Sequence, residues 1–487
     1  MKLALIDQVQ EAAGEPRQLD PRARLEMLCD DGTLRLVRTT VQSDSPRSQP
    51  GDGVLVGSGR VGGRPVYCYA QDSSVVGGSL GASHAESIVR VMEMAARSRT
   101  PIVGFVESGG ARMDEGVAAL AGYGQIFRAQ VALSGRVPQV MVVSGTSAGG
   151  GAYSPALADF VIMAPDANMF LTGPGVVNEV MGEDVTAAEL GGPEIHAKNG
   201  VSHLSAHTDA HAVLLARELL AYLPAHAGAE LPTIPSGPAP LSDPSASVPR
   251  SPRKVYDVRE VIRALADDGR TLETNERYAR NIVTALGRIE GGPVGFVANQ
   301  PRWLGGVIDA DAAQKAARFV RTCNAFGVPL VVLVDTPGFL PGTRQEQGGV
   351  IRHGAKLLHA FAEATVPRFT VVLRKAYGGG FITMNSRDLG ADLMLAWPDA
   401  EIGVVGATQA VKIVNRREIA AADDPEEAAR DLAARYAAEN LGAEVAARQG
   451  FIDELVMPAQ TRDRLAWALA GAGSEGRHGA DRGNIPL

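Results

Sequence analysis

The fifteen residues VPQVMVVSGTSAGGG, from Val137 to Gly151, have a counterpart later in the chain. The counterpart, VPRFTVVLRKAYGGG, runs from Val366 to Gly380, so the two glycine triplets lie 229 residues apart (378 − 149). Each stretch is an apolar run that ends in three glycines. This pattern is typical of a buried strand that turns sharply into a helix.

The repeat extends beyond these stretches in both directions. Upstream, the offset is 228: the matched pairs are Gly77-Gly78 with Gly305-Gly306, Ser83 with Asp311, Glu86 with Gln314, and Pro101 with Pro329. Downstream, the offset is 233, as Pro165-Asp166-Ala167 matches Pro398-Asp399-Ala400. So little insertion between matched blocks indicates two copies of one domain. Short apolar runs at 54–56, 66–69, 101–106 and 138–143 alternate with helical patterns, which predicts an α/β fold.

Length and charge narrow the class of protein. A chain of 487 residues is too long for one hydrophobic core, and 45% hydrophobic content is typical of a globular protein. The net charge of −8, without a basic stripe, argues against nucleic-acid binding. No run approaches the ~18 apolar residues that a membrane span needs, and no secretory signal is evident, so we expect a cytoplasmic protein that binds no membrane.

Three cysteines, Cys29, Cys68 and Cys323, are scattered along the chain without a Cys-x-x-Cys pair. We interpret them as lone core thiols, and we expect no disulfide framework. No His, Cys and Asp cluster has the spacing of metal ligands, so we expect no bound metal.

Composition divides the chain into an N-terminal domain (1–225), a Pro-rich linker (226–253) and a C-terminal domain (254–487). In the first domain, Ser83 and Glu86 have the spacing of a capping box, and Asp311 and Gln314 stand at the corresponding helix start. Residues 423–448 predict one long exposed helix, and the tail from Gly471 is expected to be frayed.

The glycine triplets are the first candidates for function. Backbone N–H groups at such a turn can bind an oxyanion, because glycine lets a ligand approach the backbone closely. The alternative is that the glycines only permit tight packing. A phosphate-binding loop is a second alternative, but neither of its glycine motifs follows these strands. A serine hydrolase is a further alternative, because Gly145-Thr-Ser147-Ala-Gly149 fits the Gly-x-Ser-x-Gly pattern, but the second copy has no serine there.

Longer motifs around the triplets resemble the carboxyltransferase (β) subunits of biotin-dependent acyl-CoA carboxylases, in the propionyl-CoA carboxylase-like branch. They cover roughly residues 18 to 460 and include Glu107-Ser-Gly-Gly-Ala-Arg112, Ser144-Gly-Thr-Ser-Ala-Gly-Gly-Gly-Ala-Tyr-Ser-Pro155, Asp335-Thr-Pro-Gly-Phe-Leu-Pro-Gly-Thr343, Gly348-Gly-Val-Ile-Arg-His-Gly-Ala-Lys356 and Arg374-Lys-Ala-Tyr-Gly-Gly-Gly380. The zinc-binding cysteines of the bacterial acetyl-CoA carboxylase β type are absent from this sequence.

The resemblance implies two tandem crotonase-like (ClpP/crotonase) superdomains and a division of labour between them. The family's reaction develops negative charge on two oxygens, and backbone donors suit both. The first triplet, Gly149, Gly150 and Gly151, would hold the thioester oxygen of acyl-CoA. The second triplet, Gly378, Gly379 and Gly380, would hold the ureido oxygen of biotin. Which N–H of each triplet points at the ligand is left open.

Further site residues follow from the same resemblance. The residues assigned to the substrate are Gly109, Gly110, Ala111, Arg112, Tyr153 and Ile382, and those assigned to biotin are Gly348, Gly349 and Arg352. Arg112 would pair either with a CoA phosphate or with Glu115. Ile382 departs from the aspartate of many propionyl-CoA-type relatives, which opens the acyl preference to acetyl-CoA or longer chains; the alternative is that Ile382 is simply a core residue. We interpret His353 as a structural residue.

The resulting expectation is a carboxyltransferase that moves a carboxyl group from carboxybiotin to the α-carbon of propionyl-CoA or acetyl-CoA, giving methylmalonyl-CoA or malonyl-CoA. The chain lacks a Met-Lys-Met biotinylation motif, so biotin would arrive on a biotin carboxylase/biotin carrier α subunit. The family implies a homo-hexamer built as a trimer of dimers. The alternatives are the carboxyltransferase component of a biotin-dependent decarboxylase, a simple enoyl-CoA hydratase or isomerase, and an assembly scaffold.

Overall fold

The computed structural model describes residues 18–237, 239–240, 242–251, 254–472 and 483–485. The chain forms two compact units that divide between Pro232 and Thr233, within the expected linker. The last described residues, 483–485, belong with the first unit rather than with the second. There Asn484 is buried, and its Nδ2 donates to Asp159 Oδ1 at 2.8 Å.

The first unit contains an eight-stranded sheet with the order β1-β2-β3-β4-β5-β6-β8, and β7 also pairs with β5. β1 and β3 each pair with β2 antiparallel, and the pairs from β3 onward are parallel. The strands are β1 (Arg35–Val37), β2 (Val54–Val61), β3 (Arg64–Gln71), β4 (Ile102–Ser108), β5 (Gln139–Ala148), β6 (Phe160–Met163), β7 (Asn168–Phe170) and β8 (Leu204–Ser205).

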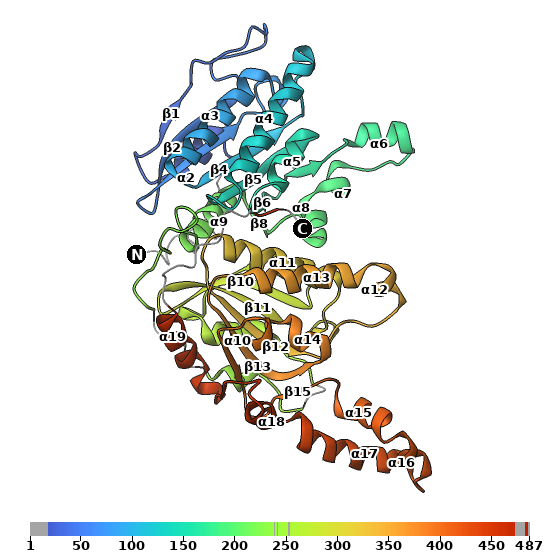
Figure 1. The fold of residues 1–487 in the computed structure, drawn as a ribbon. Coiled ribbons are helices and arrows are strands. Elements are labelled where there is room, and N and C mark those ends of the chain that lie inside the picture. Colours follow the sequence, from blue (N-terminus) through green and yellow to red (C-terminus); the bar gives the residue numbers. More distant parts are fainter. Residues whose placement is uncertain (1–17, 238, 241, 252–253, 473–482, 486–487) are drawn as a thin grey trace. The chain divides into compact units, whose positions relative to one another are not determined.

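Helices cover this sheet, and α3 and α4 lie side by side along it (Figure 1). The helices are α2 (Pro21–Leu28), α3 (Ala82–Ser98), α4 (Val117–Leu133), α5 (Gly150–Ala156), α6 (Pro174–Met181), α7 (Ala187–Gly191), α8 (Pro193–Asn199) and α9 (Asp209–Tyr222). The core between α3, α4 and the sheet is apolar, with Ile88, Met92 and Ile126 buried.

The second unit repeats this topology. Its sheet has the order β9-β10-β11-β12-β13-β14-β16, with β15 paired to β13. Its strands are β9 (Thr271–Thr274), β10 (Ile282–Ile289), β11 (Gly292–Asn299), β12 (Leu330–Thr336), β13 (Arg368–Tyr377), β14 (Leu393–Ala396), β15 (Glu401–Gly403) and β16 (Glu454–Leu455). Even the irregularity is repeated, because the strand register shifts between Val106 and Ser108 and again between Val334 and Thr336.

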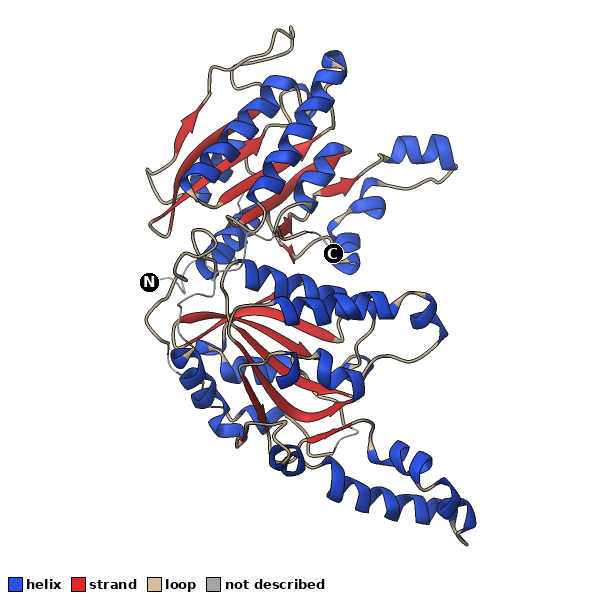
Figure 2. Cartoon of the chain, in the orientation of Figure 1, coloured by secondary structure: helices blue, strands red, loops and turns tan. Residues whose placement is uncertain are grey.

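Figure 2 shows the second sheet with helices packed along it. The helices are α10 (Val258–Leu265), α11 (Ala310–Ala325), α12 (Thr343–Gln347), α13 (Val350–Glu363), α14 (Gly378–Thr383), α15 (Ala407–Val414), α16 (Arg416–Ala421), α17 (Pro425–Tyr436), α18 (Ala443–Arg448) and α19 (Thr461–Gly471). β12 is buried throughout, as expected for a parallel strand covered on both faces.

The predicted helix starts were wrong in detail. α3 begins at Ala82, so Ser83 lies inside the helix and forms no capping box with Glu86. A residue distant in sequence caps the helix instead, because Glu115 Oε2 accepts from the Ala82 N–H at 2.6 Å. In the second unit Asp309 is the N-cap of α11, accepting from Ala312, and Asp311 stands within the first turn.

The predicted long helix over 423–448 is interrupted. α17 ends at Tyr436, a π-helical turn follows over Ala437–Leu441, and α18 begins at Ala443. The repeated alanines carry helical propensity throughout, but Gly442 adopts an extended conformation that ends the helical path. The expected frayed tail lies largely outside the described residues.

Candidate functional site

Both glycine triplets stand where the sequence predicts, at the carboxyl end of a long parallel strand. β5 ends at Ala148 and α5 begins at Gly150, while β13 ends at Tyr377 and α14 begins at Gly378. Gly149 and Gly378 adopt positive φ angles of 58° and 55°, which glycine alone adopts without strain. The two turns are therefore the same backbone device in two copies.

In the first turn, hydrogen bonds single out one N–H group. The Gly149 N–H donates to Phe170 O at 3.0 Å, and the Gly151 N–H bonds to the Tyr123 hydroxyl. The Gly150 N–H has no acceptor among the residues that the structure describes. A Cβ at Gly150 would lie 2.6 Å from the Tyr123 ring, so this position admits only glycine. Gly150 thus offers the free donor of this turn.

Tyr123 supports the first turn from below. Its ring underlies Gly150, and its hydroxyl is 3.0 Å from Ser108 Oγ at the end of β4. Burial raises the pKa of Tyr123, against the lowering effect of the hydrogen bonds from Ser108 and Gly151, so the phenol stays neutral. The sequence analysis missed this residue, because a tyrosine within a helical apolar pattern looks like ordinary core.

In the second turn, the three glycines have different neighbours. A Cβ at Gly380 would lie 2.9 Å from Gly338 Cα, so this glycine permits close backbone packing. A Cβ at Gly379 would meet the Phe339 ring at 3.4 Å, an ordinary van der Waals contact, and Gly379 is exposed. Within the described part of the chain, no acceptor bonds the N–H of any of these three glycines. The second turn is thus the more open of the two.

Charged networks of opposite balance lie beside the two turns. In the first unit, Arg24 pairs with Glu107 at 3.1 Å and with Asp209 at 2.9 Å, one cation against two anions. In the second unit, Asp335 stands at the position matching Glu107, and it pairs with Lys375 Nζ at 2.7 Å and Arg374 Nε at 3.0 Å.

Gly145 in the first unit and Arg374 in the second stand at matching positions, which explains why the two networks differ in charge. A Cβ at Gly145 would lie 2.5 Å from the Glu107 carboxyl carbon, so Glu107 uses the space that this glycine leaves. The matching position in the second unit is Arg374, which fills that space with a cation. Lys375, three residues before the second triplet, is the second cation that pairs with the buried Asp335.

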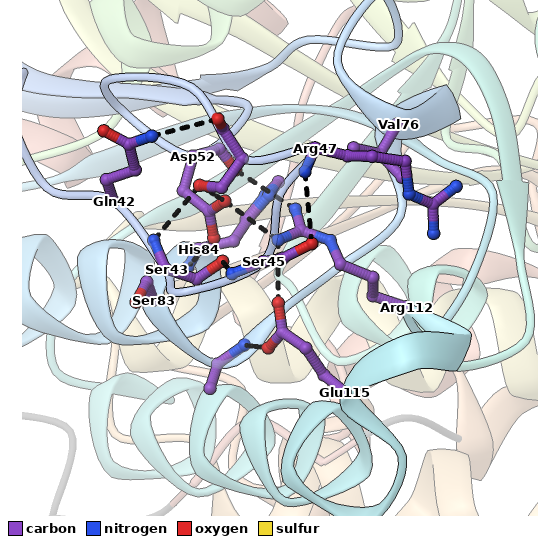
Figure 3. A network of polar contacts seen from close by, with 12 residues as sticks. Gln42, Ser43, Ser45, Arg47, Asp52, Val76, Ser83, His84, Arg112 and Glu115 are labelled. Atoms are coloured by element: carbon purple, nitrogen blue, oxygen red, sulfur yellow. Dashed lines mark hydrogen bonds and ion pairs between the residues drawn. The ribbon is translucent and has the colours of Figure 1, made fainter.

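The loop Gly109–Arg112 follows β4 and is held by backbone hydrogen bonds to Leu80, at 2.8 Å from Gly110 and 2.9 Å from Arg112. The Arg112 guanidinium is buried and pairs with Asp52 and Glu115, each at 2.8 Å (Figure 3). Of the two roles left open for Arg112, the structure has the pairing with Glu115. Its pairing with a CoA phosphate stays a prediction.

Asp52, the partner of Arg112, also bonds to Ser48 and His84 (Figure 3). It accepts from Ser48 Oγ at 2.6 Å and from the His84 N–H at 3.1 Å. Burial lowers the pKa of His84 to about 4, so the ring is neutral near pH 7. Sequence spacing gave no sign of Asp52, because it lies 60 residues before Arg112 (112 − 52).

The remaining predicted residues lie on the elements that adjoin the turns. Tyr153 is 51% exposed on α5, where its ring meets Phe127 edge-on at 6.1 Å. Ile382 is 49% exposed on α14, so it is not a core residue. Gly348 ends α12, Gly349 is the N-cap of α13, and Arg352 stands exposed in the first turn of α13.

Phe339, which the sequence analysis did not select, connects α13 with the second turn. A Cβ at Gly354 on α13 would lie 3.0 Å from its ring, whose other side faces Gly379. Arg352 itself contacts the neighbouring His353, 3.3 Å away, and its pairing with a ligand stays a prediction.

The serine-hydrolase alternative fails on geometry. Ser147 lies inside β5 and is fully buried, and its Oγ donates to Val106 O at 3.4 Å. A nucleophile would stand exposed at the apex of the turn. Over the described ranges, no group of three His, Cys, Asp or Glu side chains could hold a metal ion, and no helix is long and apolar enough to cross a membrane.

Comparison with known proteins agrees with this geometry. Residues 17–482 match the carboxyl transferase domain family. The methylmalonyl-CoA carboxyltransferase 12S subunit of Propionibacterium freudenreichii subsp. shermanii is 46% identical over 96% of this chain and 93% of its own. The putative propionyl-CoA carboxylase beta chain of Bacillus subtilis is 47% identical over 96% and 94%. The methylmalonyl-CoA decarboxylase subunit alpha of Veillonella parvula is 42% identical over 96% and 93%.

A crystal structure of the transcarboxylase 12S hexamer with methylmalonyl-coenzyme A and methylmalonic acid superposes with a TM-score of 0.92 at 44% identity. It covers 100% of this chain and 97% of that chain. The expected fold of two crotonase-like superdomains is therefore confirmed. By domain match, fold and sequence identity, the chain belongs to the carboxyl transferase family, as a carboxyltransferase (β) subunit of the biotin-dependent acyl-CoA carboxylase type.

Proposed function

We propose that this chain transfers a carboxyl group from carboxybiotin to the α-carbon of propionyl-CoA or acetyl-CoA, giving methylmalonyl-CoA or malonyl-CoA. The observation that carries the proposal is the pair of equivalent turns with N–H donors that the described chain leaves unpaired. Removing the α-proton of a thioester develops negative charge on the thioester oxygen. A fixed backbone donor stabilises such an oxygen without a metal or a side-chain acid.

At the first turn, Gly150 is the donor to the thioester oxygen. Gly149 and Gly151 already bond to Phe170 and Tyr123, so they orient the turn rather than bind substrate. This assignment narrows the triplet to one catalytic N–H. Tyr153, exposed one turn further along α5, offers an aromatic wall to the acyl-CoA.

At the second turn, Gly378 and Gly379 are the donors to biotin, and Gly380 supports them by its backbone contact. The residues present fit the ureido oxygen of biotin, because the N–H groups of the half-buried Gly378 and the exposed Gly379 lie together without an acceptor among the described residues. Biotin, when bound, supplies the carboxyl group that is transferred. The positive surplus of Arg374 and Lys375 over Asp335 favours negative charge at this turn.

The acyl chain is selected next to Ile382. An exposed apolar side chain at this position, where an aspartate would repel hydrophobic substituents, suits a methyl group or a longer chain. Gly109, Gly110 and Ala111 line the approach to the first turn. Arg112 acts there as a positioning residue, because it clamps this loop to Asp52 and Glu115.

The chain works with a separate biotin carboxylase and biotin carrier and assembles as a homo-hexamer in the cytoplasm. Apolar side chains stand exposed on α6 and on α15, among them Val180, Met181, Ile413 and Val414. Exposed apolar surface of this kind suits burial between copies. The similar transcarboxylase 12S protein assembles as a hexamer, which supports the same assembly here.

A decarboxylase component is the second candidate. The 42% identity to a methylmalonyl-CoA decarboxylase subunit favours it, since the same two turns serve the transfer in reverse. Direction then depends on the partner that regenerates or consumes carboxybiotin.

One reconstitution distinguishes these functions. The purified chain is mixed with a biotinylated carrier and an active biotin carboxylase, then given ATP, bicarbonate and acetyl-, propionyl- or butyryl-CoA. We expect ATP-dependent carboxylated product, with the preferred chain length changed in Ile382→Asp. Transfer of the carboxyl group from methylmalonyl-CoA to the biotinylated carrier, without any carboxylation of the acyl-CoAs, would favour the decarboxylase. Neither activity from an intact oligomer would refute both.

A further inference from the structure

The three cysteines are not equivalent, and two of them contact each other. The Cys68 thiol hydrogen-bonds the Cys29 sulfur, although the residues are 39 apart in sequence (68 − 29). Cys29 is the C-cap of α2, and Cys68 lies in β3. Both side chains are buried, at 3% and 0% exposure. All three cysteines are free and buried, as the prediction of core thiols expects, but Cys29 and Cys68 are neighbours whereas Cys323 stands apart.

A glycine in the neighbouring strand makes this contact possible. A Cβ at Gly59 would lie only 2.4 Å from the Cys29 sulfur and 3.0 Å from its Cβ. Gly59 stands two residues from Gly57, which pairs with Cys68 across the β2–β3 ladder. Residues two apart on a strand share a face, so Cys29 occupies the empty position beside Cys68 on one face of the sheet.

The surroundings make Cys29 the reactive member of the pair. The hydrogen bond from Cys68 lowers the pKa of Cys29, and the positive charge of Arg217 contributes, against the opposing effects of burial and of the Asp30 carboxylate. That guanidinium is anchored on both sides of the cysteine, because it bonds to Leu28 O and to Asp30 Oδ1. The Cys29 hydrogen bond and burial raise the pKa of Cys68, which is the proton donor of the pair.

The protein surface comes within one residue of Cys29. Asp30, which directly follows it, and Glu26 in α2 line an open hollow of ≈ 580 Å³. Cys323 has no such setting, since it is buried in the second unit and burial alone raises its pKa.

We propose that Cys29 and Cys68 form a redox-responsive dithiol that closes to a disulfide when the protein meets hydrogen peroxide. The Cys29 thiolate attacks one peroxide oxygen, the O–O bond breaks, and hydroxide leaves, so Cys29 becomes a sulfenic acid. The Cys68 sulfur then attacks the Cys29 sulfur. Its proton and the departing hydroxide form water. Two thiols and one hydrogen peroxide thus give one disulfide and two waters.

The bond would stabilise the first unit without touching its glycine turn. It closes a loop that contains β1 and β2, and closing a loop restricts the unfolded chain. Cys68 aligns with Val103, which aligns with Val140, and β5 continues for eight residues from there to Ala148. At ~3.3 Å per residue the turn is about 26 Å further along the strand. The proposal is independent of the carboxyl-transfer function.

The test treats the full-length oligomer with graded hydrogen peroxide, then counts free thiols in denaturant and maps disulfides by non-reducing peptide mass spectrometry. We expect the thiol titre to fall from three to one and a single Cys29–Cys68 linked peptide to appear within each chain. The unfolding temperature should rise in the oxidised protein and return after dithiothreitol. Carboxyl-transfer activity should be unchanged.

Matched variants separate this chemistry from general oxidation. Cys323→Ser should still form the bond and show the thermal shift, whereas Cys29→Ser and Cys68→Ser should each lose both. If Cys68→Ser fails to fold, Cys29→Ser carries the comparison, because its position is at a helix end. Loss of thiols without the linked peptide, a bond to Cys323, or linkage only between chains would overturn the proposal.

Discussion

Replacing Gly379 tests whether the second turn acts through its open backbone. A Cβ there meets Phe339 at 3.4 Å, so alanine is tolerated, and its better helix propensity offsets the new contact by about 0.8–1.0 kcal/mol. Valine adds two γ-carbons that the 3.4 Å contact leaves no room for on the Phe339 side. They therefore extend toward the exposed side of the turn, over the N–H donors.

The expected loss can be stated for Gly379→Val. Losing one oxyanion donor costs about 2.7–4 kcal/mol of transition-state stabilisation, or about 10²–10³ in kcat. The assay is carboxyl transfer from a carboxylated carrier to propionyl-CoA, with thermal unfolding and oligomer size measured on the same samples. Gly379→Ala should be intermediate in activity and equal to the wild type in stability.

Two comparisons make the result decisive. Gly471→Val is the matched control in the same unit, because nothing lies within 4 Å of a Cβ there and the residue is exposed at the end of α19. Gly380→Ala should instead lose stability, since its Cβ would lie 2.9 Å from Gly338 Cα. A Gly379→Val protein that is folded, assembled and fully active would refute the role of this turn.

The other predictions concern buried charges and the acyl pocket. Asp52→Ala leaves Glu115 as the one carboxylate, among the described residues, paired with the buried Arg112 guanidinium and should destabilise the first unit by about 3–5 kcal/mol in urea unfolding, with partial recovery in Asp52→Ala/Arg112→Met. His84 has a folded-state pKa of about 4, below its unfolded value, so the unfolded chain binds the extra proton. Unfolding free energy should therefore fall as pH drops from about 6.5 toward 4, and less so in His84→Gln. Burial lowers the pKa of Lys315 to about 7, so the stability of the second unit should rise from pH 7 toward 10, and Lys315→Met should flatten this rise. Ile382→Asp should lower kcat/KM for butyryl-CoA more than for acetyl-CoA; an unchanged ratio would remove Ile382 from the acyl pocket.

Local pattern was enough to predict the architecture. An apolar strand followed by three glycines fixes a strand, a sharp turn and a helix start within a few residues. Because the pattern occurs twice, it also implied two equivalent sheets. The positions of β4 and β5 could be predicted for the same reason, since a buried parallel strand must be apolar along its length.

The choice among the glycines depended on contacts that no spacing encodes. Gly150 is distinguished from Gly149 and Gly151 only because Phe170 and Tyr123 take the other two N–H groups. The cap of α3 comes from Glu115, 33 residues after Ala82, rather than from the serine next to it. Tyr123 lies on α4 and Glu115 in the turn before it, so the packing of this segment supplies these two partners, while Phe170 comes from β7.

By itself, the sequence determined the duplicated fold, the two glycine turns and the family, because each is expressed by residues close together along the chain. Only the tertiary structure decided that Arg112 pairs with Asp52 and that Cys29 meets Cys68. These contacts join loops and helix ends that are distant in sequence. Which residues meet depends on the register between strands and on the glycines that leave space for a side chain. The local pattern of apolar residues does not specify either of these.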